Sequence, residues 1–500
     1  MNMQYVARRK ITSISFFIAL TALTFFHLTT IFLPSINLEF AFADAVDYFR
    51  TGNADLLEQY FRYQANTLAF PFAGYLLGIL LPLDPLILLR LLSTFGLLML
   101  GLSMRRIASF FGADFGLGFY FVLLLNPLIW TFAGRATADL FPAATAIYAL
   151  SLTLRKDGNT ASELSAGILF GVAGILKYHV LGLSVVLFFA SCPLLGFRIA
   201  ARKTALVTFV GLSIVAAFLI FNHLKFGFVL TPERYQEIHH LSFRNYFGNL
   251  IGYFGFIILI LTPFVFIVPK FQNALIESWK IALSAAAAAF FFGFMFVVDS
   301  GELNLGPLDH WISHSIRFGL LSLFVLTGLV ALLLQLKQDP VFRRRKTLLL
   351  LGLFIVLLVF SSTRPAQRYL IAFFPFFLML LPPTVFTRKR IVLPTLALLV
   401  LANTFIAYSQ WSTGMAAQRM VYFLIEARKI EATDPGDIGG HVGNLFRGSD
   451  PKKASFRVVS GRVSDAIFMS ESPFSFARKT YSLVPISSGS EMEGHPTEKK

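Results

Sequence analysis

The sequence predicts an all-α, polytopic membrane protein. Apolar residues make up 56% of the 500 and charged residues only 14%, and the mean hydropathy is +0.69. A soluble globular protein carries about 25% charged residues. The apolar residues are also gathered into about thirteen runs of spanning or nearly spanning length. An aqueous core cannot hold this much apolar surface, so we expect the bilayer to be the main solvent of the chain.

The predicted spans follow one another along the first 408 residues. They are 11–33, 85–104, 114–131, 138–154, 164–176, 180–196, 204–222, 250–268, 281–298, 318–336, 347–361, 369–386 and 391–408. The apolar run 66–82 is left out because it contains Pro71, ends at Pro82 and would place every later basic cluster on the wrong side of the membrane. It is predicted to be a juxtamembrane or re-entrant piece of a first outer loop, 34–84.

The net charge of +16 is distributed as short Lys and Arg clusters between the apolar runs. This pattern is typical of membrane topology set by the positive-inside rule, and it argues against nucleic acid as a partner. With the N terminus inside, basic residues are roughly twice as frequent in the inner loops as in the outer ones. Acidic residues show the opposite bias, which suggests that the outer face carries the chemistry.

The two ends of the chain differ in character. Residues 11–33 are long enough to span, and no small-residue cleavage site follows, so we predict a retained first helix. Residues 409–500 are polar, rich in Ser, Gly and Pro, and lack a spanning run. They are predicted to form a small extracytoplasmic α/β or partly disordered region after a transmembrane module over 1–408. Its tail, 485–500, is predicted to be disordered.

Four polar clusters stand at the predicted outer ends of apolar runs. They are Asp44, Asp47, Tyr48 and Arg50; Arg135 and Asp139 in "GRATAD"; Lys177 and His179 in "KYH"; and Arg364, Arg368 and Tyr369 in "STRPAQRY". Charged residues at membrane depth are costly and are therefore functional candidates. Together the clusters supply carboxylates and several cations on one face.

This combination suits glycosyl transfer from a lipid phosphate. A phosphate on the anomeric carbon is already a good leaving group, so it needs no acid to protonate it. One carboxylate must deprotonate the incoming hydroxyl, and cations must stabilise the departing phosphate. Arginine suits the second role because its planar fork binds phosphate oxygens bidentately. A single displacement of this kind inverts the anomeric centre.

At these residues the chain resembles the GT-C family of polyprenyl-phosphate-sugar-dependent glycosyltransferases, in particular its bacterial aminoarabinose, galacturonosyl and mannosyl transferases. The family places an Asp after its first membrane helix in a D-x-x-x-Y setting followed by Gly, here Asp44, Tyr48 and Gly52. The resemblance continues through "LLRLLS", "NPLIW…GRATADLFPAA", "GVAGILKYHVLG", "KFGFVLTPERY" and "RPAQRYLIAFFPFF". These degenerate motifs extend in order over roughly the first 400 residues.

The resemblance implies a GT-C architecture and assigns roles to individual residues. Asp44 resembles the catalytic base and Asp139 the second acidic residue of the site. Residues expected at the donor, above all its phosphate, are Tyr48, Arg135, Lys177, His179, Arg364, Arg368 and Tyr369. The family often has two adjacent acids first; here Ala45 follows Asp44, so a role of the second acid is absent or has moved to Asp47.

The resemblance also implies partners and a location. The donor is a polyprenyl-phosphate sugar, and the acceptor is a lipid or a cell-surface glycan such as lipopolysaccharide. Membrane lipids are further partners. The enzyme is expected to be a multi-pass protein of the inner membrane with its site facing the periplasm. No cofactor is predicted, and the sequence leaves open whether a divalent metal ion takes part.

Each candidate also has a purely structural interpretation. Asp44 could cap a helix, and Asp47 could be a solvated neighbour. Asp139 could pair with Arg135 across one helical turn. Lys177 could snorkel to the membrane interface, and the two arginines, Arg364 and Arg368, could be membrane anchors.

Three other interpretations compete with the proposed enzyme. His310 and His314 beside Asp309 have a spacing that zinc sites use, but the pattern H-E-x-x-H is missing and Trp311 is typical of a membrane interface. The paired His239 and His240 are a weaker metal candidate. A transporter or flippase of a lipid-linked sugar would place its charges near the bilayer midplane. A scaffold without catalysis would leave all four clusters without a role.

Overall fold

The computed structural model describes most of both ends of the chain and little of its middle. The described residues are 15–24, 37–63, 68–111, 115–154, 159–229, 340–362, 367–436, 453–472 and 479–486, with single positions at 27, 246, 249, 250, 253, 257, 279 and 283. The chain divides into two compact units. The helical unit is Met1–Ile31 with Ala65–Asn403, and the mixed unit is Phe32–Gln64 with Thr404–Lys500.

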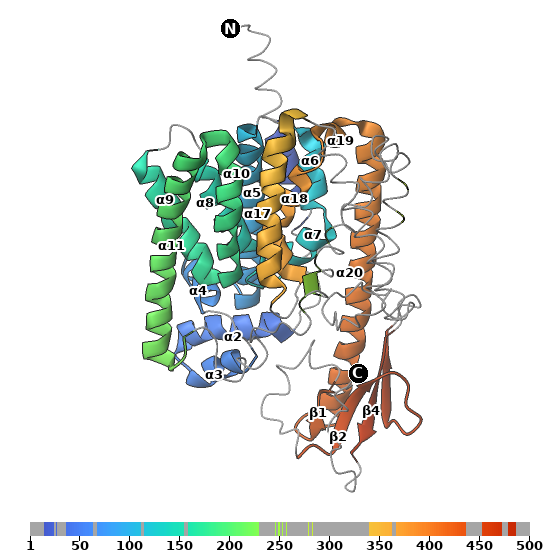
Figure 1. The fold of residues 1–500 in the computed structure, drawn as a ribbon. Helices are drawn as coiled ribbons and strands as arrows, with labels where there is room; N and C mark the ends of the chain where they lie inside the picture. The colour runs from blue at the N-terminus through green and yellow to red at the C-terminus, as the bar shows by residue number, and fades with distance from the viewer. Residues whose placement is uncertain are drawn as a thin grey trace. The chain divides into compact units, whose positions relative to one another are not determined.

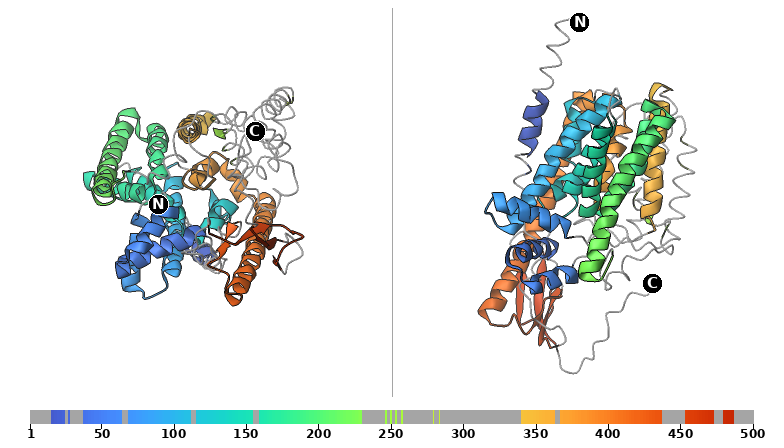
Figure 2. Two further views of the ribbon diagram at one scale, coloured as in Figure 1. Left: turned by 90° about the horizontal axis from the view of Figure 1, so that it is seen from below. Right: turned by 90° about the vertical axis from the view of Figure 1, so that its left-hand side faces the viewer.

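In the described part of the helical unit, the long helices run alongside one another (Figures 1 and 2). The helices of this part are Ser15–Thr24, α4 (Ala69–Leu80), α5 (Pro85–Phe110), α6 (Gly116–Leu124), α7 (Pro127–Ala133), α8 (Leu140–Thr153), α9 (Thr160–Leu176), η2 (Tyr178–Gly182), α10 (Leu183–Leu195), α11 (Phe197–Phe226), α17 (Pro340–Phe360), η4 (Gln367–Ala372), α18 (Phe374–Met379), α19 (Pro383–Thr387) and the first part of α20 (Lys389–Glu426).

Several described helices begin where the sequence provides a cap followed by proline. Asp84 precedes Pro85, and its Oδ1 accepts a hydrogen bond from the backbone N–H of Leu86 at 2.8 Å. Asn126 precedes Pro127 in the same way and accepts from Leu128 N–H at 3.0 Å. Proline suits the first helical position because its missing N–H would have no intrahelical partner there.

Four described helical segments are long and apolar enough to cross a membrane: α5, the run Tyr178–Leu195, α11 and α20. The pair α6 and α7 is a fifth if the bend between them lies within one span. The prediction of a mostly helical membrane protein with several apolar spans is thereby confirmed. The spans predicted at 250–268, 281–298 and 318–336 lie outside the described residues apart from isolated positions, and the total of about thirteen stays a prediction.

Two predicted spans are not single straight helices. The run 114–131 is broken after Leu124, and the two pieces α6 and α7 meet at 59°. The run 369–386 is divided among η4, α18 and α19, so its prediction as one spanning helix was wrong. Prolines in the first turns of α7, α18 and α19 explain both breaks, since proline starts a helix easily and interrupts one.

Other boundaries also differ from the predicted ones. Helix α20 has 38 residues and continues past Tyr408 to Glu426, through the predicted boundary between 1–408 and 409–500. Helices α8 and α9 have 14 and 17 residues. Helix α4 has 12 residues, fewer than the roughly 17 that cross a hydrocarbon core, in agreement with leaving 66–82 out of the spans.

Basic residues gather at one end of the helical unit, which is called its basic end below. Helix α9 begins near the start of α11, where Lys203 lies 3.4 Å from Glu163. Helix α17 begins near the end of α5, because Arg345 donates to the carbonyl of Phe111 at 2.9 Å. The topology set by the positive-inside rule predicts several described basic residues to be inside, and all of them lie at this end of their helices. They are Arg105, Arg106, Arg198, Arg202, Lys203, Arg345, Arg388, Lys389 and Arg390. The charged residues of this unit that are predicted to be outside and that the structure describes lie at the opposite ends of their helices.

Close helix packing depends on glycine at one position between α5 and α8. A Cβ on Gly96 would lie 2.8 Å from the Cα of Phe141. A backbone atom cannot rotate away, so we expect Gly96→Ala to force the helices apart and to destabilise the protein by about 1–3 kcal/mol. A thermal unfolding curve of the purified protein measures this. Gly101→Ala is the control, since its Cβ would meet only the side chain of Leu20; an equal loss in both variants would contradict the explanation.

The mixed unit contains α2 (Asn37–Thr51), α3 (Ala54–Tyr63), the rest of α20 and a small sheet. The strands are β1 (Thr433–Asp434), β2 (Phe456–Ser460), β3 (Phe468–Glu471) and β4 (Thr480–Pro485), in the order β1-β2-β4-β3. β1 is parallel to β2, and the other pairs are antiparallel. Val458 and Leu483 pack with Met420 and Leu424 of α20, so the sheet lies on the helix (Figure 1). The small C-terminal sheet agrees with the predicted α/β region.

Candidate functional site

A buried, non-helical segment between α7 and α8 carries two of the predicted residues. Residues 134–139 form turns and bends, and all of them are buried. Helix α5 holds the backbone of this segment: Thr94 Oγ1 donates to the carbonyl of Ala133 at 3.0 Å, and Ser93 Oγ donates to that of Thr137 at 3.4 Å. Polar side chains in an otherwise apolar helix therefore fix the loop that presents Arg135 and Asp139.

Asp139 forms a buried ion pair with Lys177. Asp139 Oδ1 and Lys177 Nζ are 3.6 Å apart, and their side chains are only 1% and 8% exposed. Lys177 reaches inward because α9 ends at Leu176 and the backbone of Lys177 is extended. The snorkelling interpretation of Lys177 was therefore wrong. The helical pairing of Asp139 with Arg135 was also wrong, since residues 135–138 are not helical.

The segment η4 adds further predicted residues to the same place. It contacts α7, α8 and η2. The ring centroids of Tyr369 and His179 are 4.9 Å apart, and that of Phe360 is 6.2 Å from His179. The charges of Lys177 and Arg368 and the ring of His179 all act electrostatically on Asp139. Three segments far apart in sequence thus bring Asp139, Lys177, His179, Arg368 and Tyr369 together.

In this cluster, two buried polar atoms of one side chain have no hydrogen-bond partner among the described residues. They are the two ring nitrogens of His179, Nδ1 and Nε2. A buried donor or acceptor left unsatisfied costs about 1–3 kcal/mol. Native structures satisfy nearly all such groups with protein, water or ligand. The cluster therefore has the donors and the charges to bind a polar, anionic group.

Asp44 lies in the middle of α2, in the mixed unit. The helix begins seven residues earlier at Asn37, so Asp44 does not cap it. Phe42 anchors α2 to α3 by an edge contact with Tyr60, whose ring centroid is 5.7 Å away. Asp44 itself is half-buried. Tyr48, one turn later, is on the same side of the helix as Asp44.

The neighbouring residues of α2 have structural roles. Asp47 has a side chain that is 43% exposed and lies 3.5 Å from Arg50 Nη1, as expected of a solvated neighbour. Gly52 has a φ of +72° and donates from its N–H to the carbonyl of Tyr48 at 2.8 Å. A left-handed glycine is a common helix terminator. The glycine of the Asp44–Tyr48–Gly52 pattern thus ends the helix.

Reasoning from sequence missed several buried polar residues. Arg90, only 3% exposed, lies inside the apolar helix α5, one turn before Thr94. Its charge within an apolar run is the signal that could have revealed it. Glu163 and Lys203 form a second buried ion pair at the basic end of the unit, and Lys203 also donates to the carbonyl of Thr153 at 3.4 Å.

Some predicted residues cannot be placed. Arg364, the segment with His310 and His314, and the pair of His239 and His240 lie outside the described residues. Within the described ranges no group of three or more His, Cys, Asp or Glu side chains is arranged to hold a metal ion.

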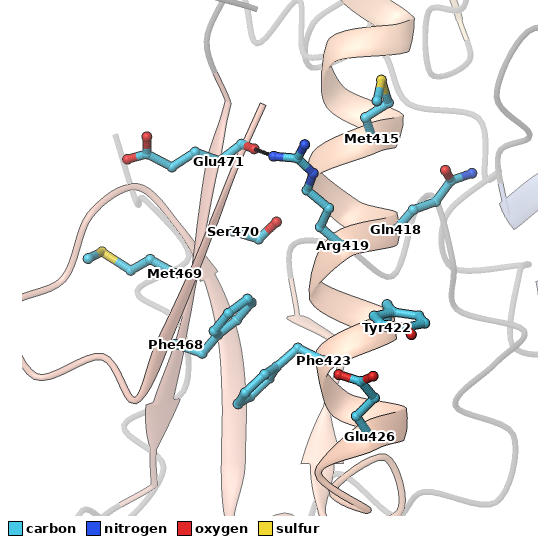
Figure 3. Close-up of a pocket in the computed structure, with 10 residues that line it drawn as sticks. All are labelled: Met415, Gln418, Arg419, Tyr422, Phe423, Glu426, Phe468, Met469, Ser470 and Glu471. Carbon is cyan, nitrogen blue, oxygen red and sulfur yellow. Dashed lines mark hydrogen bonds between the residues drawn. The ribbon is translucent and has the colours of Figure 1, made fainter. Parts of the chain in front are cut away.

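The mixed unit has a surface hollow of about 580 Å³ between α20 and β3 (Figure 3). The rings of Phe423 and Phe468 line it, and their centroids are 3.9 Å apart in a stacked arrangement. Arg419 donates to the backbone carbonyl of Glu471 at 3.2 Å. In Figure 3 the carboxylate of Glu471 points away from α20, and it pairs with Arg462. The charged groups of Arg419 and Glu471 therefore do not converge on one ligand position in this hollow.

Comparisons with known proteins give a structural likeness and no sequence match. No protein-family model and no curated protein sequence matches the chain. Two crystal structures of ArnT from Cupriavidus metallidurans match it over 94% of its length. The structure with bound undecaprenyl phosphate is 14% identical, with 97% of that chain covered and a TM-score of 0.39. The apo structure is 16% identical, with 98% covered and a TM-score of 0.42. Identities of 14% and 16% with TM-scores of 0.39 and 0.42 are too low to transfer a function to this chain. The function has to be inferred from its own side chains.

Proposed function

We propose that this protein is an integral membrane glycosyltransferase of GT-C architecture. It transfers a sugar from a polyprenyl-phosphate donor to a hydroxyl of a lipid or cell-envelope glycan, such as lipopolysaccharide. The observation that carries the proposal is the buried cluster of Asp139, Lys177, His179 and Arg368 at the end of an apolar helical unit. A membrane-embedded carrier with a charged phosphate needs such a combination of apolar helices and buried cations.

The cluster supplies what the leaving group requires. When the anomeric carbon separates from the phosphate, negative charge develops on the phosphate oxygens. Lys177 and Arg368 stabilise that charge, and His179 can donate a hydrogen bond. Asp139 holds Lys177 in place while no phosphate is bound, because an unpaired buried ammonium would be costly. Arg135 and Tyr369 are proposed to complete the phosphate and sugar contacts.

Asp44 is proposed as the base, with Tyr48 beside it on α2. The acceptor oxygen attacks the anomeric carbon as the bond from that carbon to the phosphate oxygen breaks. The acceptor proton passes to the Asp44 carboxylate, and the polyprenyl phosphate leaves with its electron pair. One displacement inverts the anomeric configuration. Asp139 cannot serve as readily as this base, since it is already paired with Lys177.

The distribution of charge supports a periplasmic site in the inner membrane. The basic positions predicted to be inside lie at one end of the helical unit, and the Asp139 cluster lies at the other. If the basic end faces the cytoplasm, the cluster opens toward the periplasm. Accessibility of a cysteine introduced at Arg198 to a membrane-impermeant thiol reagent tests this orientation; it should be labelled only after the cells are opened.

Stereochemistry tests the proposed reaction. Purified protein is given a polyprenyl-phosphate sugar labelled in the sugar, together with a candidate acceptor lipid, and the product is analysed by NMR. We expect a product whose anomeric configuration is opposite to that of the donor. Retained configuration would contradict the single displacement. Failure to transfer sugar to any lipid or glycan acceptor, with donor binding intact, would contradict the enzyme itself.

A further inference from the structure

An apolar groove lies at the basic end of the helical unit, between α6, α19 and the first turns of α20. Its volume is about 430 Å³, within the range of about 300–1,000 Å³ that is typical of ligand sites. Its walls include Leu117, Phe121, Val392, Leu393 and Leu396. Leu393 is 63% exposed, so the groove is open on the face of α20 that a membrane lipid would cover.

Three consecutive cations stand at one end of this groove. Arg388, Lys389 and Arg390 are all exposed, and Lys389 lines the groove itself. In the part of the chain that the structure describes, no carboxylate forms an ion pair with any of the three. Long basic side chains at the end of a membrane helix extend to the headgroup level. The groove thus combines an apolar wall for a hydrocarbon chain with positive charge where a phosphate would lie.

We propose that this groove binds a diacyl phospholipid with an anionic headgroup. One acyl chain lies along Val392, Leu393 and Leu396, and Lys389 holds the headgroup phosphate with Arg388 and Arg390 nearby. Basic pockets between membrane helices are known to recognise anionic headgroups in this way. The occupant is a lipid of the surrounding bilayer rather than the sugar carrier, because the groove is at the end of the helical unit opposite Asp139 and Lys177.

Competition between labelled lipids tests the proposal. The full chain is placed in phosphatidylcholine vesicles with a trace of spin-labelled phosphatidylglycerol or, separately, spin-labelled phosphatidylcholine, and the protein-associated fraction is measured. We expect a preference for phosphatidylglycerol that falls about fivefold with Lys389→Gln, the factor that corresponds to one cation near a phosphate. Arg198→Gln is the matched control, an exposed cation at the same end that does not line the groove.

A second variant separates a built site from general attraction of the basic surface. Leu393→Trp fills the groove without touching the core and should lower the association of phosphatidylglycerol although every charge is kept. Equal losses in Arg198→Gln and Lys389→Gln, or no loss in Leu393→Trp, would overturn the proposal. Displacement of the label by polyprenyl phosphate more readily than by unlabelled phosphatidylglycerol would also overturn it, and would assign the groove to the carrier.

Discussion

Replacing Asp44 with asparagine should slow sugar transfer by about 10²–10⁴-fold, the usual contribution of a positioned general base. The amide keeps the size of the side chain and can still accept a hydrogen bond, but it cannot take the proton of the acceptor hydroxyl. Binding of the donor phosphate does not need this carboxylate. We therefore expect kcat to fall while the affinity for the polyprenyl-phosphate sugar changes little. Initial rates at saturating donor, with donor binding measured separately, check both parts.

Asp47→Asn is the internal control for this prediction. Asp47 is on the same helix, three residues away, but its side chain is 43% exposed and pairs with Arg50 at i, i+3. Exposed ion pairs contribute roughly 0–1 kcal/mol, so its loss should leave α2 folded and transfer nearly unchanged. If Asp47→Asn lowered the rate as much as Asp44→Asn, the base would have to be reassigned.

Breaking the pair of Asp139 and Lys177 should have the second largest effect, on stability as well as on activity. Removal of one partner leaves the other charge buried without compensation, which costs about 3–5 kcal/mol. We expect Asp139→Leu or Lys177→Met alone to lower the unfolding midpoint strongly. The double variant should regain much of that stability, since no buried charge remains, and yet stay inactive. A double-mutant cycle of thermal unfolding and transfer rate measures the coupling.

The second buried pair provides a matched comparison. Glu163 and Lys203 are 3.4 Å apart and equally buried, but they lie at the basic end of the unit, near the start of α9. Glu163 also lies 3.7 Å from Arg202, so Lys203→Met alone should cost less stability than Glu163→Leu alone. The double variant Glu163→Leu with Lys203→Met should be folded and should keep its donor binding. If this pair proved as necessary for donor binding as Asp139 and Lys177, the phosphate site would not be confined to one end.

The residues of the candidate cluster could be predicted from the sequence more accurately than the bounds of the helices that surround it. Charged residues at the ends of apolar runs point to Asp139, Lys177, His179 and Arg368, and these residues lie together in the structure. The partner of Asp139 was assigned wrongly because Arg135 is nearer along the chain, whereas Lys177 approaches only through the packing of α8 against α9. Tertiary contacts of this kind leave no mark on local spacing.

The missed features have a common physical cause. A hydropathy window averages over a proline, so the run 369–386 looked like one span although Pro375 and Pro383 begin new helices. It also averages over single polar residues, so it hides Ser93 and Thr94, the two residues of α5 that hold the site loop. Short helices and buried polar side chains interrupt membrane segments where function requires it.

The most direct test of the central claim follows two labels at once. The donor carries one isotope in the sugar and another in the polyprenyl chain, and the protein is reconstituted in liposomes with an acceptor lipid. The proposed chemistry predicts that the sugar label moves to the acceptor while the other label remains in free polyprenyl phosphate, and that Asp44→Asn stops both changes. Movement of both labels together to the opposite leaflet, with the donor intact, would contradict the enzyme and indicate a flippase instead.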